Sequence, residues 1–234
     1  MAHGDDNYPP YEMVKNNKLT GFHVELIKEV AKKLEITVRF KSYPWKRALT
    51  MVKNGKVDAV TFVGVNADRS NYIIFTPGNE LSFAHTGLVV LASRKSEFNF
   101  NGKQLDNLRH FKFGHNLGFI YGNYYDLAKL DKSPFTSNEQ LFNMLRIQRI
   151  DIAVLNAGEF KHRISINDKT TQELVMLDKR VAIANYLGFS KPRKLQALAQ
   201  RFAKAMVDFK KSPQFLNLMK KYQLEESQVS NFPL

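Results

Sequence analysis

The first 63 residues alternate between helical segments with one apolar face and short apolar runs, and no other feature restricts the fold as strongly. Residues 22–34 and 44–55 repeat apolar side chains at the spacing of an amphipathic helix. Residues 36–41 and 57–63 are runs of strand length that follow those helices. Strands joined through helices need crossover connections, which make neighbouring strands parallel. The sequence therefore predicts an α/β fold.

The rest of the chain continues this alternation, and its first part forms a second α/β unit. The predicted strands are 86–93, 111–115, 151–155 and 181–190, and the predicted helices are 124–130, 138–148, 193–209 and one that begins at Ser212. This unit opens after about residue 92 and closes near residue 182. No Pro-, Gly- or Ser-rich linker separates the two units, so we expect short, strand-like crossings that act as hinges.

Composition and charge exclude several classes of protein. The chain has no cysteine, which removes thiol chemistry and favours an exported protein without disulfides. Its formal net charge is +13, but the Lys and Arg residues are spread along the chain without an arginine-rich tail or zinc-finger spacing, so we predict no nucleic-acid partner. The longest apolar runs, 88–92 and 152–155, are much shorter than the roughly 20 residues of a membrane-spanning helix.

The sequence predicts no catalytic residue, no metal site and no cofactor. Its six histidines are scattered, and neither H-E-x-x-H nor G-x-S-x-G occurs. His85 and His115 could line a binding cleft, but we favour ordinary hydrogen-bonding roles for both.

Candidate binding residues follow the predicted strands of the first unit. Tyr8 and Tyr11 flank two prolines that stiffen the loop; Tyr8 is the better ligand candidate, whereas Tyr11 is interpreted as a core residue. Trp45 begins a helix directly after a strand, where ligands lie in open α/β sheets, and its ring can stack on a ligand. Gly64 and Arg69 follow the next strand: the glycine lets backbone amides approach a ligand, and the planar fork of the arginine matches a carboxylate.

Candidates in the second unit also follow strands. Residues 116–122 form a glycine-containing loop between a strand and a helix, a setting that binds anions, and they match neither the Rossmann nor the Walker pattern. Asn116 and Tyr121 are its candidate ligand contacts. Asn156 follows the strand at 151–155, and its amide can both donate and accept.

Several short motifs follow one another along nearly the whole chain. They are Tyr8-Pro9-Pro10-Tyr11, GFHVEL at 21–26, PWKRAL at 44–49, GKVDA at 55–59, Asp68-Arg69 followed by Phe75-Thr76-Pro77, and Arg149-Ile150-Asp151. In this order they resemble the family 3 extracellular solute-binding proteins, the amino-acid-type receptors of ABC importers. The Pro-Trp motif is similar to a divergent branch of that family.

The resemblance implies the type II periplasmic binding protein fold, an α/β fold of two lobes, each with a mixed, mostly parallel sheet flanked by helices. Residues 1–91 and 185–234 would form lobe 1, and residues 92–184 would form lobe 2. Such a receptor captures a small amino-acid-like or carboxylate-bearing ligand in the cleft between its lobes and delivers it to the membrane permease of an ABC importer. We expect a monomer in the periplasm whose signal peptide has been removed.

The resemblance also implies roles for the site residues. Tyr8 and Trp45 would sandwich the ligand, and Arg69 would hold its α-carboxylate. A residue of the loop at 116–122 would contact the ligand from lobe 2. In the family, an acid after the 151–155 strand receives the α-ammonium, but here the residue is Asn156. The candidates for supplying the missing charge are Glu12, Glu80 and Glu159.

Two other functions stay open at this point. One is an enzyme on the same fold, similar to the cyclohexadienyl dehydratases, although the neutral Asn156 argues against an acid or base at that position. The other is a sensor module of a signalling receptor.

Overall fold

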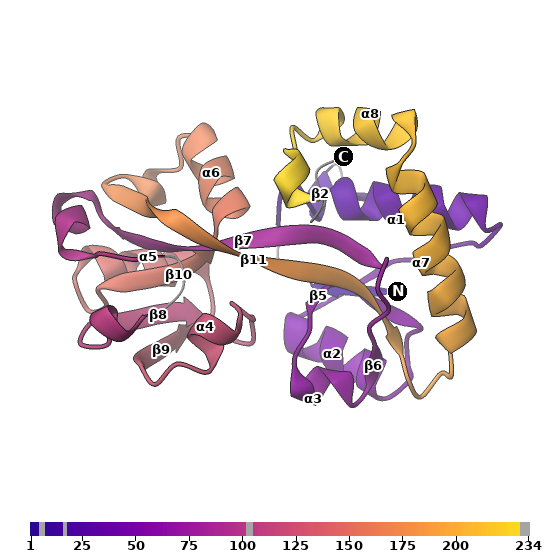
Figure 1. The fold of residues 1–234 in the computed structure, drawn as a ribbon, viewed down its shortest axis with the longest axis horizontal. Helices are drawn as coiled ribbons and strands as arrows, with labels where there is room; N and C mark the ends of the chain where they lie inside the picture. Colours follow the sequence, from indigo (N-terminus) through magenta and orange to yellow (C-terminus); the bar gives the residue numbers. More distant parts are fainter. Residues whose placement is uncertain (5–7, 16–17, 102–104, 230–234) are drawn as a thin grey trace. The chain divides into compact units, whose positions relative to one another are not determined.

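The chain forms two compact units, seen in the computed structural model of Figure 1, which describes residues 1–4, 8–15, 18–101 and 105–229. Unit 1 comprises residues 1–83 and 184–234, and unit 2 comprises residues 84–183. The strands β7 (Glu80–Leu91) and β11 (Leu174–Ser190) each run from one unit into the other. The first boundary between the units lies between residues 83 and 84, inside β7, whereas the sequence placed it between residues 91 and 92, at the end of that strand. A strand that runs through a boundary carries no turn residues to mark it.

Unit 1 contains five of the eight described α-helices and both described ends of the chain. Besides its parts of β7 and β11, its strands are β1 (Ala2–Gly4), β2 (Met13–Lys15), β3 (Lys18–Thr20), β4 (Lys41–Tyr43), β5 (Ala59–Gly64) and β6 (Ile73–Ile74). Its helices are α1 (Phe22–Lys33), α2 (Trp45–Lys53), α3 (Ala67–Ser70), α7 (Gln196–Lys210), α8 (Pro213–Lys221) and the 3-10 turn η4 (Glu226–Gln228).

The sheet of unit 1 is mixed. Its order is β4-β1-β5-β11, with β6 paired to β11. β1 is parallel to both β4 and β5, as the crossover helices predict, whereas β11 is antiparallel to β5 and β6. The strand predicted at 36–41 begins only at Lys41, because the register with β1 starts there. The apolar side chains at 36, 38 and 40 still pack on the core, which explains their alternation.

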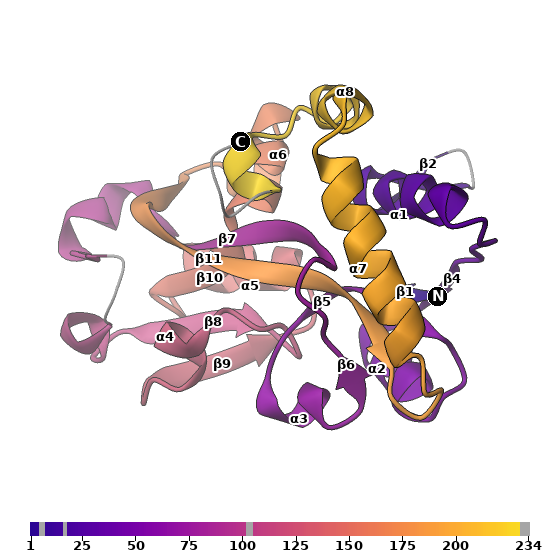
Figure 2. The ribbon, with the colours of Figure 1, turned by 45° about the vertical axis from the view of Figure 1, so that its right-hand side comes forward.

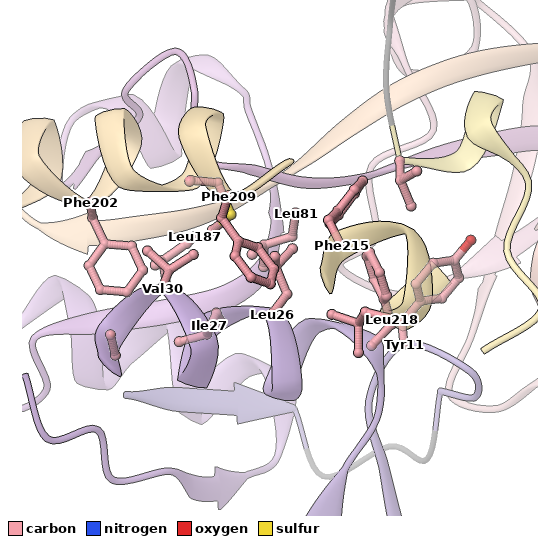
Figure 3. Packing of buried hydrophobic residues seen from close by; sticks show 14 of the residues in the cluster. Tyr11, Leu26, Ile27, Val30, Leu81, Leu187, Phe202, Phe209, Phe215 and Leu218 are labelled. Atoms are coloured by element: carbon pink, nitrogen blue, oxygen red, sulfur yellow. The ribbon is translucent and has the colours of Figure 1, made fainter. Parts of the chain in front are cut away.

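Two apolar clusters cover opposite faces of this sheet. Side chains of α1, α7 and α8 form the larger one, and Figure 3 shows Leu26 and Val30 of α1 facing Phe202 and Phe209 of α7. The smaller cluster packs α2 against the other face, where Ala48 and Val52 meet β5. Figures 1 and 2 show α1, α7 and α8 together on one side of the unit and α2 on the other. Tyr11 is buried in the larger cluster, so its interpretation as a core residue is confirmed.

A bulge in β5 interrupts the alternation of side chains between these faces. Ala59 packs in the cluster of α1, and Val60 packs in the cluster of α2. Strict alternation would place Phe62 with α2 and Val63 with α1. Phe62 instead packs with α1, and Val63 packs with α2. The register against β11 shifts at the same place, and Phe62 has a φ of 54°. A β-bulge inserts one extra residue into a strand, and in one common type of bulge a residue adopts the left-handed conformation. The bulge therefore turns the Phe62 ring towards α1.

Unit 2 is a second α/β sandwich. Besides its parts of β7 and β11, its elements are η1 (Ala92–Glu97), η2 (Asp106–Leu108), β8 (Lys112–Asn116), α4 (Asn123–Asp126), β9 (Asp131–Phe135), α5 (Asn138–Arg146), β10 (Ile152–Asn156), α6 (Ala157–Ser165) and η3 (Lys169–Thr171). The strand order is β7-β10-β8-β9. β8 is parallel to both β9 and β10, and β7 is antiparallel to β10.

Successive side chains of a central strand of unit 2 point alternately into its two apolar clusters. Along β10, residues 152 and 154 face one cluster, and residues 153 and 155 face the cluster that contains α5 and α6. One prediction for this unit was wrong: the helix expected at 124–130 is the short α4, and β9 follows it. β9 is an edge strand with Pro134 in it, so its sequence lacks the apolar alternation of a central strand. Among the described residues, no helix is long and apolar enough to cross a bilayer.

Candidate functional site

Three predicted residues of unit 1 follow the carboxyl ends of adjacent parallel strands. Trp45 begins α2 and is separated from the end of β4 by one residue, Arg69 comes shortly after β5, and Tyr8 follows β1. These strands lie side by side in the order β4-β1-β5. Ligands of open α/β sheets bind at this edge, so the topology places an indole, a guanidinium and a phenol at the expected edge of unit 1.

Arg69 is held firmly at this edge. The amide of Asn66 caps the short helix α3 by accepting from the Arg69 backbone N–H at 2.8 Å, which sets the position of the arginine. Its side chain is only 5% exposed, and Nη1 donates to the carbonyl oxygen of Gly64 at 3.0 Å. The guanidinium also lies over the Trp45 ring, 5.5 Å from its centroid. The structure thus brings together three of the predicted residues: Trp45, Gly64 and Arg69.

Tyr8 belongs to an aromatic group of its own. It is buried, and a bridge between its backbone and that of Glu12 closes the loop that contains the two prolines. Its ring lies 5.3 Å from that of Phe62, which also contacts the rings of Tyr11 at 5.7 Å and His23 at 5.0 Å. Phe62 therefore supports the Tyr8 ring, a role that no sequence pattern indicated, because an aromatic residue in a buried run looks like an ordinary strand residue.

A line of Glu12, His23 and Ser82 lies behind this aromatic group. His23 Nε2 is 2.8 Å from Ser82 Oγ, and His23 Nδ1 is 3.4 Å from Glu12 Oε1. These residue types match a hydrolytic triad, but His23 and Ser82 are 0% exposed, so no substrate reaches the hydroxyl. Burial lowers the pKa of His23. The line is an internal polar network that joins the Tyr8 loop to β7.

Glu80, a second candidate for the missing charge, is engaged within unit 1. Its carboxylate accepts from the backbone N–H of Gly78 at 2.7 Å, and its carbonyl oxygen accepts from Lys210 Nζ at 2.6 Å. Burial lowers the pKa of Lys210 to about 8. Glu80 therefore stabilises the start of β7 in unit 1.

In unit 2, Asn116 and Asn156 end the parallel strands β8 and β10, so both lie at the carboxyl edge of that sheet. The backbone N–H of Asn116 donates to the hydroxyl of Tyr121 at 2.9 Å, which joins two of the predicted residues. Burial raises the pKa of Tyr121, so its hydroxyl stays protonated near neutral pH. His115 Nδ1 lies 3.0 Å from the hydroxyl of Tyr125, which confirms an ordinary hydrogen-bonding role for this histidine.

The residue at the position of the family acid has a structural role in this chain. Asn156 is the N-cap of α6, and its Oδ1 accepts from the backbone N–H of Glu159 at 3.0 Å. Glu159 is the candidate acid that lies at this edge of unit 2. It is 3% exposed, and its Oε1 accepts from the amide nitrogen of Asn138 and from Arg163 Nε, the latter at 3.2 Å. Within the described ranges, no cluster of His, Cys, Asp and Glu could hold a metal ion.

Comparison with known proteins gives a family and several relatives. Residues 2–225 match the bacterial extracellular solute-binding proteins, family 3. The L-cystine-binding protein TcyJ of Escherichia coli (strain K12) is 26% identical over 157 residues, which are 65% of this chain and 56% of TcyJ. The ABC transporter arginine-binding protein 1 of the same strain is 24% identical over 191 residues, 77% of this chain and 71% of that protein. The alignment therefore spans little more than half the length of TcyJ.

A solved structure supports the predicted fold. A histidine kinase sensor domain with similarity to periplasmic binding proteins superposes with a TM-score of 0.75 at 23% identity, covering 96% of each chain. The α/β type II periplasmic binding protein fold, predicted from the sequence motifs, is thereby confirmed.

Proposed function

The chain belongs to family 3 of the bacterial extracellular solute-binding proteins, and we propose that it captures an amino acid for the permease of an ABC importer. The members of this family and the relatives found are binding proteins, not enzymes. The ligand class is proposed from the relatives, which are named for cystine and arginine. The importer is proposed from the name of the arginine-binding relative.

The observation that carries this proposal is the setting of Arg69. Its guanidinium is oriented by the Gly64 carbonyl and the Trp45 ring at the carboxyl edge of unit 1. A fork held in one orientation loses little side-chain entropy when it binds a carboxylate in two parallel hydrogen bonds. We propose that Arg69 grips the carboxylate of the ligand while the rings of Tyr8 and Trp45 cover its apolar part.

The polar residues of unit 2 are proposed to meet the other end of the same ligand, as the sequence motifs indicate. Asn116, Tyr121 and Asn156 support this role because they gather at the edge where α/β sheets bind ligands. Asn156 would contribute mainly by fixing the first turn of α6, since its side-chain oxygen caps that helix.

The proposed function also includes a location, an oligomeric state and a movement of the two lobes. We propose a periplasmic monomer of the Pro-Trp branch, in which closure of the two lobes on a ligand forms the surface that the permease recognises. The family name, which places its members outside the cell, supports this location.

A ligand screen tests the proposal. A thermal-shift screen of the twenty L-amino acids, cystine, polyamines and small carboxylates should raise the melting temperature with at least one amino acid. Arg69→Ala should abolish that shift, whereas Arg201→Ala, which removes an exposed arginine of α7, should retain it. A screen without an amino-acid hit, an equal response of the two variants, or chemical conversion of the hit would each contradict the proposal.

The second candidate function is a sensor module, favoured by the similarity to the histidine kinase sensor domain. Uptake of the radiolabelled hit by cells with and without the gene separates the two functions. Deletion should abolish high-affinity uptake if the protein serves an importer. Unchanged uptake together with a lost transcriptional response to the hit would favour the sensor.

A further inference from the structure

Four side chains at the carboxyl edge of unit 2 are joined end to end by hydrogen bonds. We call them the amide relay; they are Asn116, Asn138, Glu159 and Arg163. Asn116 ends β8, Asn138 begins α5, and the other two lie one turn apart on α6. Asn116 Nδ2 donates to Asn138 Oδ1 at 2.6 Å, Asn138 Nδ2 donates to Glu159 Oε1, and Arg163 Nε donates to the same oxygen at 3.2 Å.

The relay is shielded from water. Asn116 is 6% exposed and Asn138 is 8% exposed, so neither amide can exchange its partner for bulk solvent without a rearrangement. Arg163 is partly exposed and also pairs with Asp168 at 2.8 Å, which anchors the guanidinium beside Glu159. The positive charge of Arg163 stabilises the ionised carboxylate of Glu159.

This arrangement fixes which end of each amide faces which neighbour. An ionised carboxylate can only accept, so Asn138 must turn its NH₂ group towards Glu159. The oxygen of Asn138 then faces Asn116, which must in turn donate with its own NH₂ group. The orientation of both amides therefore follows from the charge of Glu159, which contacts Asn138 directly and reaches Asn116 through it.

The oxygen of Asn116 is the end of the relay. Oδ1 is buried and has no hydrogen-bond partner within the part of the chain that the structure describes. Buried polar atoms in native proteins are nearly always hydrogen-bonded. Asn116 Oδ1 lies at the carboxyl edge of the sheet, so we expect a bound molecule to supply the missing hydrogen-bond donor. Reversal of the amide would not relieve it, because the two oxygens of Asn116 and Asn138 would then face each other.

We propose that Asn116 Oδ1 accepts a hydrogen bond from an N–H group of the ligand and that Asn138 and Glu159 are positioning residues that fix this polarity. The proposal rests on the proposed function and specifies the ligand class: solutes that present an N–H donor, charged or neutral, to unit 2. Groups that only accept, such as a keto oxygen or a second carboxylate, are rejected because they would face the Asn116 oxygen. The donor preference is thus set by a neutral amide that a remote carboxylate orients.

Paired ligands test the proposal by isothermal titration calorimetry. Every amino acid that binds in the screen of the twenty L-amino acids and cystine is compared with its desamino and 2-oxo counterparts. The wild-type protein should prefer the amino acid by about tenfold or more, the size of one hydrogen bond to a charged group. Asn116→Leu should reduce this preference to about threefold or less, and Glu159→Gln should reduce it in part, since a glutamine amide can face Asn138 either way.

A matched control isolates the relay from the ion pairs of Arg163. Glu139→Gln removes a carboxylate that lies 3.8 Å from the same guanidinium but is largely exposed and contacts neither asparagine of the relay in any described hydrogen bond. This variant should keep the wild-type preference. A Glu159→Gln preference equal to that of wild type and of Glu139→Gln would overturn the inference, and thermal melts of all variants exclude loss of fold as the cause.

Side-chain amide NMR tests the polarity without any ligand. The NH₂ protons of Asn116 and Asn138 should both be protected from solvent exchange, and both pairs of signals should move in Glu159→Gln and stay in place in Glu139→Gln. Exposed Asn116 NH₂ protons would overturn the inference even if amino acids bind. Absence of any amino-acid binding, with the NMR pattern as expected, would instead contradict the proposed function.

Discussion

Replacing Phe62 by alanine and by glycine tests whether the bulge in β5 is strained. Phe62 has a φ of 54°, a conformation in which the Cβ atom of an L-residue crowds the following carbonyl. Both variants lose the same ring contacts to Tyr8, Tyr11 and His23, so those contacts cancel when the two variants are compared. What remains is the difference between alanine and glycine at one backbone position.

The size of that difference follows from two opposing effects. In an ordinary strand, glycine destabilises by about 0.5–1 kcal/mol relative to alanine because it has more freedom in the unfolded chain. In the left-handed region, the Cβ of alanine costs about 1–2 kcal/mol that glycine avoids. Phe62→Gly should therefore be more stable than Phe62→Ala by about 0.5–1 kcal/mol. For a chain of this size the melting temperature should differ by about 1–4 °C.

A second position in the same strand supplies the control. Ala59 is fully buried and has an ordinary φ, so Ala59→Gly should destabilise by about 1–2 kcal/mol through lost methyl burial and added chain freedom. Thermal melts and urea titrations of the variants, followed by circular dichroism, give the order of stability. At position 59 glycine should be less stable than alanine. If Phe62→Gly is also less stable than Phe62→Ala, the left-handed conformation of residue 62 is not strained and the reasoning is refuted.

Three further predictions concern pH and single backbone contacts. Burial lowers the pKa of His23 in the folded state, so the imidazole is protonated at a higher pH in the unfolded chain than in the folded protein. The free energy of unfolding should therefore fall by about 1.4 kcal/mol per pH unit as the pH drops below about 6.5. His23→Gln should remove this part of the slope in urea titrations between pH 7 and pH 5, and an unchanged slope would contradict it. A Cβ at Gly21 would lie 2.3 Å from the carbonyl oxygen of Tyr11, so Gly21→Ala should lower the melting temperature and weaken amino-acid binding through the Tyr8 loop; normal affinity would count against that coupling. Ser212 caps α8 by accepting from the backbone N–H of Phe215, so Ser212→Ala should cost about 1 kcal/mol in a thermal melt, and Ser212→Asp should recover it.

The sequence was sufficient for features that depend on neighbouring residues. Helical spacing predicted α1, α2 and α5, and short buried runs predicted β5, β8 and β10. Loops after those strands indicated the site candidates, because a loop that follows a parallel strand lies at the carboxyl edge of its sheet. The ordered motifs indicated the family. β9 escaped prediction because an edge strand needs no apolar alternation and tolerates a proline.

Only the tertiary structure decided what the candidate side chains do. Asn156 was expected to contact the ligand in place of an acid, and the structure shows its oxygen capping α6. Glu159 was one of three acids that the sequence could not place, and the fold brings it to the edge of unit 2 beside Asn138. Phe62 reached the Tyr8 ring through a bulge that no residue pattern marks.

The physical reason is the range of the interactions. Spacing along the chain records which face of an element is apolar, since that depends on residues a few positions apart. Two hydrogen bonds of the amide relay, from Asn116 to Asn138 and from Asn138 to Glu159, join residues 22 and 21 positions apart on different elements, and their polarity depends on the charge of Glu159. The sequence by itself thus determined where the carboxyl edges of the two sheets form, and the tertiary structure determined which side-chain atoms at those edges are held by hydrogen bonds.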